Sequence, residues 1–196
     1  MSLQDQTFKK INKQYTPLSF FANPKDEAEF FDYWKRYSKR MIEAQDPSLV
    51  KKVSRLFKSI EKEKNDDLFV KDLEIKKVND LIGWGVFAKR KIPKKTILTH
   101  YAGIIKKDRQ VSNKNRHVFG FTGTEKLKNW VIDSESVTNM GSLINHSKNG
   151  NVEAMEYYDK KGPKIVFETI RDIEKGEELT YDYGEGYWKG LKEKPR

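Results

Sequence analysis

The chain contains no cysteine and only three histidines among its 196 residues. The lack of cysteine excludes disulfides, thiolate zinc sites and a cysteine nucleophile. The three histidines, His100, His117 and His146, lie far apart in sequence, so a metal site would consist mostly of carboxylates, and we predict no metal. No long apolar run is present and residues 1–12 are polar, which argues against a membrane span and a secretory signal. We therefore expect an intracellular protein in a reducing compartment.

Charge and aromatic content indicate a folded, basic protein. Charged residues make up 35% of the chain and aromatic residues 12%, and a chain with that many aromatics buries a core. The length suggests one domain with room for an appendage. The formal net charge of +10 favours an anionic partner such as nucleic acid, a nucleosome or an acidic protein, although a solvated lysine-rich surface explains it equally well.

The N-terminal third reads as an arm followed by two helices. Residues 1–22 resemble an arm, and Asn23-Pro24 and Asp46-Pro47 are both signals for the start of a helix. We predict amphipathic helices over 24–44 and 47–63, joined by a tight corner. Their apolar residues recur at helical spacing and form packing stripes. The stripes consist of Phe30, Trp34, Tyr37 and Met41 in the first helix and Leu49, Val53, Leu56 and Ile60 in the second.

Residues after Asn65-Asp66-Asp67 change to a β-rich pattern. LFVKDLEIKKV alternates as a strand does, and GVFA, TILTHYAGII, NWVID and KIVFETI are short β-rich runs between turns. No run is followed by a regular helix, which argues against a parallel βαβ sheet. We therefore predict a mainly β (α+β) protein in which an N-terminal helical element packs on a mainly antiparallel β domain.

Two short stretches carry polar or aromatic groups that suit a binding site. In GEELTYDYGEGYW, residues 176–188, Tyr181 and Tyr183 would face the same side of a strand and could wall a narrow slot. A solvent-facing pair on an edge strand explains them equally well. Gly83-Trp84-Gly85 alone fits a hairpin turn, because the rest of a phosphate loop is missing and no helix follows.

Three stretches together resemble, in order and spacing, the SET-domain protein lysine methyltransferases. They are GWGVFAKRKIPKKTILTHYAG, VIDSESVTNMGSLINHSKNGN and IVFETIRDIEKGEELTYDYG. The resemblance spans about residues 68–188. It implies a SET-type β-clip of small curled antiparallel sheets with a C-terminal pseudoknot. We predict an N-terminal arm and two-helix element over 1–66, a catalytic domain over 67–184 and an aromatic and basic tail over 185–196 that closes the cofactor site.

The resemblance also implies a site for S-adenosyl-L-methionine. Tyr183, Tyr181 and Tyr101 are implied as the catalytic residues, with the Tyr183 hydroxyl beside the transferring methyl and Tyr181 favouring monomethyl product. His117 lies in a segment that often adds a cofactor contact, and we interpret it as a core or surface histidine. His100 and Ile104 replace acidic residues of the commoner family pattern. The cofactor-binding residues implied are Gly83, Trp84, Gly85, Asn145, His146, Tyr183, Tyr187 and Trp188.

The resemblance favours an S-adenosylmethionine-dependent protein-lysine N-methyltransferase that acts on a histone tail, a nucleosome or another basic protein tail. Two alternatives stay open at this stage. One is a catalytically silent SET-like module that binds peptides or chromatin, and the other is a basic nucleic-acid-binding protein. Histone substrates imply the nucleus, or a host nucleus for a secreted bacterial protein, with non-specific nucleic-acid contact through the basic surface.

Overall fold

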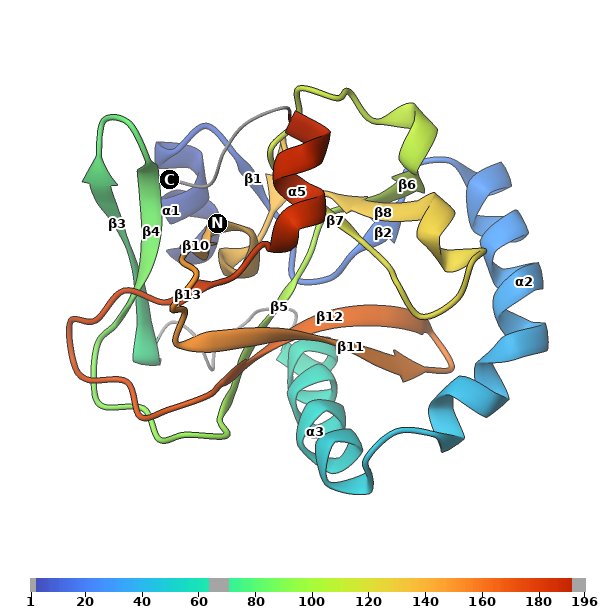
Figure 1. The fold of residues 1–196 in the computed structure, drawn as a ribbon, viewed down its shortest axis with the longest axis horizontal. Helices are drawn as coiled ribbons and strands as arrows, with labels where there is room; N and C mark the ends of the chain where they lie inside the picture. The colour runs from blue at the N-terminus through green and yellow to red at the C-terminus, as the bar shows by residue number, and fades with distance from the viewer. Residues whose placement is uncertain (1–2, 64–70, 192–196) are drawn as a thin grey trace.

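The computed structural model describes residues 3–63 and 71–191. Two long helices lie against a body of small β-sheets, and a short C-terminal helix lies on the other side of that body (Figure 1). The α-helices are α1 (Leu3–Lys10), α2 (Pro24–Glu43), α3 (Pro47–Glu63) and α5 (Gly184–Leu191). Short 3-10 turns are η1 (Asp108–Gln110), η2 (Leu127–Asn129) and η3 (Met140–Leu143).

The predicted helices over 24–44 and 47–63 are confirmed to within one residue. α2 begins where expected because the Asn23 side chain accepts a hydrogen bond from the Lys25 backbone N–H at 2.9 Å. Phe30 and Trp34 are each only 1% exposed on its inner face. The predicted packing stripe is wrong at Tyr37, which is 49% exposed and packs its ring against Tyr33, 4.7 Å away between ring centroids, instead of in the core.

α3 covers the sheet that contains β5. Val53, Leu56 and Ile60 are buried as predicted, and Phe57 joins them. The Phe57 ring packs against His100 of β5, with 5.0 Å between ring centroids. The helix and the strands therefore share one hydrophobic core, in which α3 supplies much of the apolar cover for this sheet.

Among the described residues the strands form five small sheets (Figure 1). The three-stranded sheet has the order β11 (Val152–Asp159), β12 (Gly162–Thr169) and β5 (Ile97–Tyr101). The four-stranded sheet has the order β2 (Phe20–Phe21), β6 (Ile104–Lys107), β8 (Trp130–Asp133) and β7 (Val118–Gly120). The pairs are β3 (Leu73–Asn79) with β4 (Gly83–Ala88), β1 (Gln14–Tyr15) with β9 (Val137–Thr138), and β10 (Asn145–His146) with β13 (Thr180–Tyr181).

The longer strand pairs are antiparallel, as predicted, but three short pairs are not. β1 with β9, β2 with β6 and β10 with β13 are parallel pairs of two residues each. The β domain is therefore mainly antiparallel, with these three short parallel pairs as additions that the sequence did not predict. Each pair joins segments far apart in sequence, so no hairpin turn imposes an antiparallel direction on them.

The segment predicted as an arm is part of the folded body. Phe8 of α1 is fully buried and its ring lies 5.4 Å from that of Tyr15, while β1 and β2 each pair with a strand of the β domain. At the other end, the predicted tail over 185–196 mostly forms α5, and residues 192–196 lie outside the described residues, as does the predicted boundary between 66 and 67. The term arm is therefore wrong for the N-terminal segment.

Candidate active site

Tyr183 lies just after β13, at the start of α5, with its side chain directed inward. Its hydroxyl donates a hydrogen bond to the Ile144 backbone carbonyl at 2.8 Å. Its ring centroid lies 4.7 Å from that of Tyr181 and 4.7 Å from that of Tyr187. Burial raises the pKa of Tyr183 far above its ordinary value, so the phenol stays protonated and acts as a donor at neutral pH.

Tyr181, Tyr101 and Phe119 extend the aromatic cluster around Tyr183. Tyr181 is 8% exposed and its ring lies 6.2 Å from that of Phe119, which is 5.4 Å from the ring of Tyr101. Burial raises the pKa of Tyr101 and of Tyr181 strongly, so both phenols are neutral. The sequence predicted that Tyr181 and Tyr183 face one side of a strand; β13 ends at Tyr181, so the strand does not extend to Tyr183, although the two rings are in contact. We call Phe119, Tyr181 and Tyr183 the aromatic wall.

Two cavities share the aromatic wall as part of their lining. One has a volume of about 640 Å³ and is also lined by Tyr101, Ser142 and Tyr187. The other has a volume of about 360 Å³ and is also lined by Lys148, Gly150 and the first residues of β11. All three wall residues line both cavities. A ligand on each side would therefore meet the same rings.

Asn145 and His146 form β10 and pair in register with Thr180 and Tyr181 of β13. The Asn145 side-chain amide donates to the Trp84 carbonyl at 3.2 Å and to Glu178 Oε1 at 2.7 Å. His146 Nδ1 accepts from the Tyr183 backbone N–H at 3.2 Å, which assigns the proton to Nε2. His146 Nε2 is buried without a hydrogen-bond partner among the described residues, so it is available to a ligand.

Gly83, Trp84 and Gly85 open β4, directly after the turn from β3. Gly83 has φ +86°, a conformation that disfavours any residue with a Cβ. A Cβ on Gly85 would lie 2.5 Å from Glu178 Oε1, so this glycine lets β4 approach the Asn145–Glu178 contact. Trp84 is 38% exposed. The hairpin interpretation is therefore confirmed, and the cofactor role stays a prediction.

α5 places Tyr187 and Trp188 over the site. The Tyr187 hydroxyl donates to the Arg116 carbonyl at 3.1 Å. The Trp188 ring lies 4.9 Å from that of His146 and 6.2 Å from that of Tyr183. Trp188 Nε1 is a second buried N–H without a partner in the described part of the chain. The His146 and Trp188 rings, which are in contact, thus each carry a buried N–H group without a partner in the described residues.

The structure brings the predicted residues together in two groups. Tyr101, Tyr181, Tyr183 and Tyr187 line the larger cavity, whereas Gly83–Gly85, Asn145 and His146 line neither of the two cavities. This second group is connected to the tyrosines by His146, which accepts a hydrogen bond from the Tyr183 N–H and packs its ring against Trp188. Sequence reasoning missed Phe119 and Ser142. A phenylalanine two residues before another, Phe121, and a serine in a short turn give no signal that distinguishes them from ordinary core residues.

His100 and His117 are held in their neutral forms. Burial lowers the pKa of His100 to about 3 and that of His117 to about 4, against about 6.5 in an unfolded chain. At a pH between the folded and the unfolded pKa values, the two histidines are protonated in the unfolded chain and neutral in the folded one, so the unfolded chain binds more protons. The free energy of unfolding should therefore fall as pH falls below about 6.5, with a slope near pH 5 of up to about 2.7 kcal/mol per unit.

Urea unfolding between about pH 5 and pH 6 measures this slope. Carboxylates contribute little to the slope in this range, because their ordinary pKa values of about 4 lie below it. Replacing His100 with Gln should reduce the slope by about half, whatever it does to the stability itself, because one proton is no longer taken up. A slope that stays unchanged in the His100→Gln variant would contradict the assignment.

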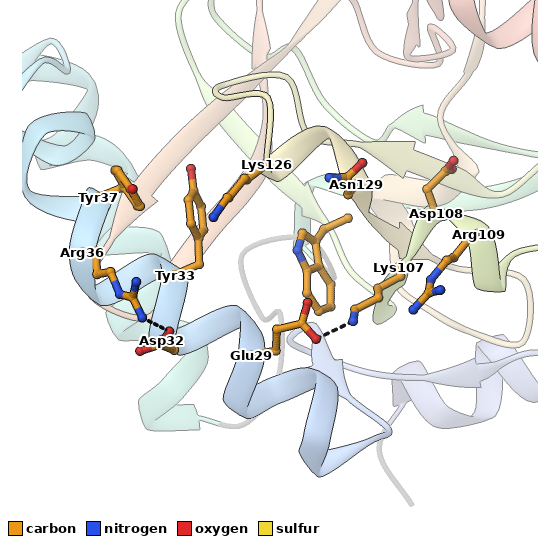
Figure 2. Close-up of a pocket in the computed structure, with 11 residues that line it drawn as sticks. Glu29, Asp32, Tyr33, Arg36, Tyr37, Lys107, Asp108, Arg109, Lys126 and Asn129 are labelled. Carbon is orange, nitrogen blue, oxygen red and sulfur yellow. Dashed lines mark hydrogen bonds and ion pairs between the residues drawn. The ribbon is translucent and has the colours of Figure 1, made fainter.

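A further cavity of about 470 Å³ lies between α2 and the ends of β6 and β8, apart from the aromatic wall (Figure 2). Figure 2 shows acidic and basic side chains alternating around it. Lys107 pairs with Glu29, and Arg36 pairs with Asp32. These charges are largely balanced, so the cavity has no strong preference for a ligand of either sign.

The described residues contain no group of three or more His, Cys, Asp or Glu side chains that could hold a metal ion. In the same part of the chain, no helix has the length and apolar character needed to cross a membrane.

A domain of several small sheets with a tyrosine cluster beside an Asn-His pair is the arrangement of a SET domain, and comparisons with known proteins agree. The SET domain family profile matches residues 83–184. This covers more than half of the chain, which therefore belongs to the SET-domain family. The fold is a mixed α/β SET fold with N-terminal helices, and relatives in this family include lysine methyltransferases.

Three curated relatives are similar over slightly more than half of the chain. The "Variant-silencing SET domain-containing protein" of Plasmodium falciparum is 32% identical over 59% of this chain and 5% of its own length. Human "Histone-lysine N-methyltransferase EHMT1" is 31% identical over 59% of this chain and 9% of its own length. Drosophila melanogaster "Histone-lysine N-methyltransferase Set8" is 32% identical over 53% of this chain and 16% of its own length. The matched region is thus a small part of each relative.

A solved structure shows the same fold. It is a humanized mutant of the Chaetomium thermophilum Polycomb Repressive Complex 2 bound to the inhibitor GSK126. The TM-score is 0.51 at 27% identity, over 57% of this chain and 15% of that one.

Proposed function

We propose that the chain is an S-adenosylmethionine-dependent protein-lysine N-methyltransferase. The observation that carries this proposal is the aromatic wall, in which a partly buried, neutral phenol, Tyr183, lines two cavities. A lysine in one of these cavities and a cofactor beside His146 and Trp188 would meet at the Tyr183 ring, which contacts both of these residues. Two relatives named as histone-lysine N-methyltransferases support it.

The residues near His146 fit a cofactor with polar edges. His146 Nε2 and Trp188 Nε1 are buried and unpartnered in the described chain, and a buried N–H is costly unless a ligand accepts from it. When bound, S-adenosylmethionine supplies an electrophilic methyl group on a sulfonium. Exposed Trp84 and the open side of Gly83 leave room at the edge of the site. The residues proposed to hold it are Gly83, Trp84, Gly85, Asn145, His146, Tyr183, Tyr187 and Trp188.

The side chains of the cluster would prepare a substrate lysine for attack. A lysine amine has an ordinary pKa of about 10.4 and must lose its proton before it can act as a nucleophile. Tyr101, Tyr181 and Phe119 bury such an amine among aromatic groups, and burial disfavours its charged form. The ammonium would release its proton to solvent before the amine enters the aromatic cluster, so no histidine base is required. The Tyr183 hydroxyl donates its own proton to the Ile144 carbonyl, which leaves its oxygen as an acceptor toward the reacting groups.

We propose a histone tail, a nucleosome or another basic protein tail as the substrate, and hence a site of action on chromatin in a nucleus. The test is to incubate the full chain with labelled S-adenosylmethionine and core histones and to analyse the products by tandem mass spectrometry. Methylated lysine is the expected result. Binding of the cofactor without any methylated protein would instead favour a silent SET-like binding module.

We predict that Tyr181→Phe raises the share of di- and trimethyl-lysine. The Tyr181 hydroxyl narrows the space beside the Tyr183 ring, 4.7 Å away between centroids, and its removal makes room for a larger methylated amine. Product states are measured by mass spectrometry at equal turnover, with Tyr158→Phe as a control outside the aromatic wall. An unchanged product distribution would contradict a role of Tyr181 in restricting methylation.

The proposal also includes a division of the chain into three parts and a crossing of chain segments next to β13. Residues 67–184 act as the catalytic domain, residues 1–66 support it, and residues 185–196 close the cofactor site. The parallel pair of β10 with β13, together with Asn151, which donates to the Glu178 carbonyl at 2.8 Å and accepts from the Thr180 N–H at 2.9 Å, supports a pseudoknot-like crossing of these segments.

A further inference from the structure

α3 has a row of cations on the face opposite its buried face. Lys51, Arg55 and Lys58 recur at intervals of four and three residues, so they project to the same side of the helix. All three are exposed. The ion pairs that α3 makes among the described residues use Lys52 with Glu168 and Glu61 with Lys161 instead. The charges of the row are thus not neutralised by the described acids.

The row lines a hollow in the corner between α2 and α3. The hollow has a volume of about 480 Å³, with Ile42, Pro47 and Val50 as its apolar part. Ser54 adds a hydroxyl, and Glu43 is the one carboxylate in the lining, against three cations. In contrast to the cavity of Figure 2, this lining has a clear excess of positive charge.

We propose that this row and its hollow bind the phosphate backbone of double-stranded DNA. With a rise of about 1.5 Å per residue, the row from Lys51 to Lys58 spans roughly 10 Å. Each DNA strand carries one phosphate per about 3.4 Å of helix axis, so this length matches about three phosphates. Lysine, arginine and serine side chains are the groups that contact phosphate oxygens without reading sequence.

An acidic protein face is a poorer match for the same surface. Protein interfaces depend on buried aromatic or large apolar anchors, and the large exposed apolar side chains of the described chain are on other elements, such as Tyr37 and Trp84. α3 also lies apart from the aromatic wall, because β11 and β12 run between α3 and α5 (Figure 1). DNA on α3 would leave the cavities open. The choice of DNA rests on the proposed function, since histone tails emerge beside DNA.

The test compares two triple variants of the full chain that lose the same charge. Lys51→Ala, Arg55→Ala and Lys58→Ala remove the row, and Lys9→Ala, Lys10→Ala and Lys175→Ala remove three exposed cations elsewhere. Binding to a labelled duplex of about 20 base pairs is measured by fluorescence anisotropy at several salt concentrations. The row variant should bind at least about tenfold more weakly, with a salt slope shallower by about 2 to 3, whereas the control should change less than about twofold.

Three outcomes would overturn the proposal. The two variants could lose the same affinity, which would mean that net charge alone matters. The row variant could bind DNA like the wild type. It could also lose binding to polyglutamate while it keeps DNA binding, which would make the partner an acidic protein. Methylation of a free histone peptide should be the same in the row variant and the wild type. If the wild type does not methylate the peptide, the proposed methyltransferase activity is refuted, while the measured DNA affinities remain a separate result.

Discussion

Tyr183→Phe is expected to lower methyl transfer by about 10²- to 10³-fold, the order of the cost of removing one preorganised polar group from a reaction site. The substitution deletes the hydroxyl that donates to the Ile144 carbonyl and keeps the ring contacts with Tyr181, Tyr187 and Trp188. Affinity for the cofactor product should therefore stay within about threefold, since the buried N–H groups of His146 and Trp188 remain in place.

Single-turnover methylation with labelled cofactor measures the first effect, and calorimetric titration with S-adenosylhomocysteine measures the second. Tyr33→Phe is the matched control, because it removes a phenol that is hydrogen-bonded to Thr124 at 2.5 Å, at a site apart from the aromatic wall. The control should keep full activity. Equal rates for Tyr183→Phe and the wild type would remove Tyr183 as the catalytic residue.

Deletion of residues 1–65 is expected to abolish folding of the remainder. The deletion removes β1 and β2, together with the buried side chains Phe8, Phe30, Trp34 and Phe57. Exposing one buried side chain of this size costs about 1.5–3 kcal/mol, and a whole domain has a stability of only about 5–15 kcal/mol. Loss of these four side chains and the two strands would consume most of that stability. His100, covered by Phe57, would meet water.

Circular dichroism and size-exclusion chromatography of residues 66–196 measure the result. Co-expression of residues 1–65 as a separate chain should restore a soluble complex, because the contacts are non-covalent. Restoration would distinguish missing packing from a fragment that is damaged in some other way. A soluble fragment that folds and methylates peptide without residues 1–65 would show that the N-terminal element is dispensable.

Local signals in the sequence predicted much of the fold. The Asp46 carboxylate accepts from the Ser48 N–H at 2.7 Å, as its place before a proline indicated, and such caps act within a few residues. The short parallel pairs were not predictable in the same way. Gln14 pairs with Val137, and nothing near either residue specifies a partner that distant. Helix α5 was missed because GEGYWKGL contains glycines that disfavour helices, which tertiary contacts of Tyr187 and Trp188 offset.

The candidate site was predicted mainly by resemblance. Spacing predicted that Tyr181 and Tyr183 lie on one side of a strand, but the strand ends at Tyr181, and the ring contact depends on the turn that follows it. The pattern of residues could not reveal that Tyr101 and Phe119 complete the cluster, because their proximity depends on the packing of β5 and β7 against β13. The free N–H groups of His146 and Trp188 are likewise a property of the packed structure.

The amide of Asn145 has a consequence for how the site assembles. It joins the carbonyl of Trp84, 61 residues earlier, to the side chain of Glu178, 33 residues later. Contacts between residues so distant along the chain form only after large loops have closed, and loop closure slows folding. During refolding, the binding groups should therefore acquire their geometry late, after the helical segments have formed.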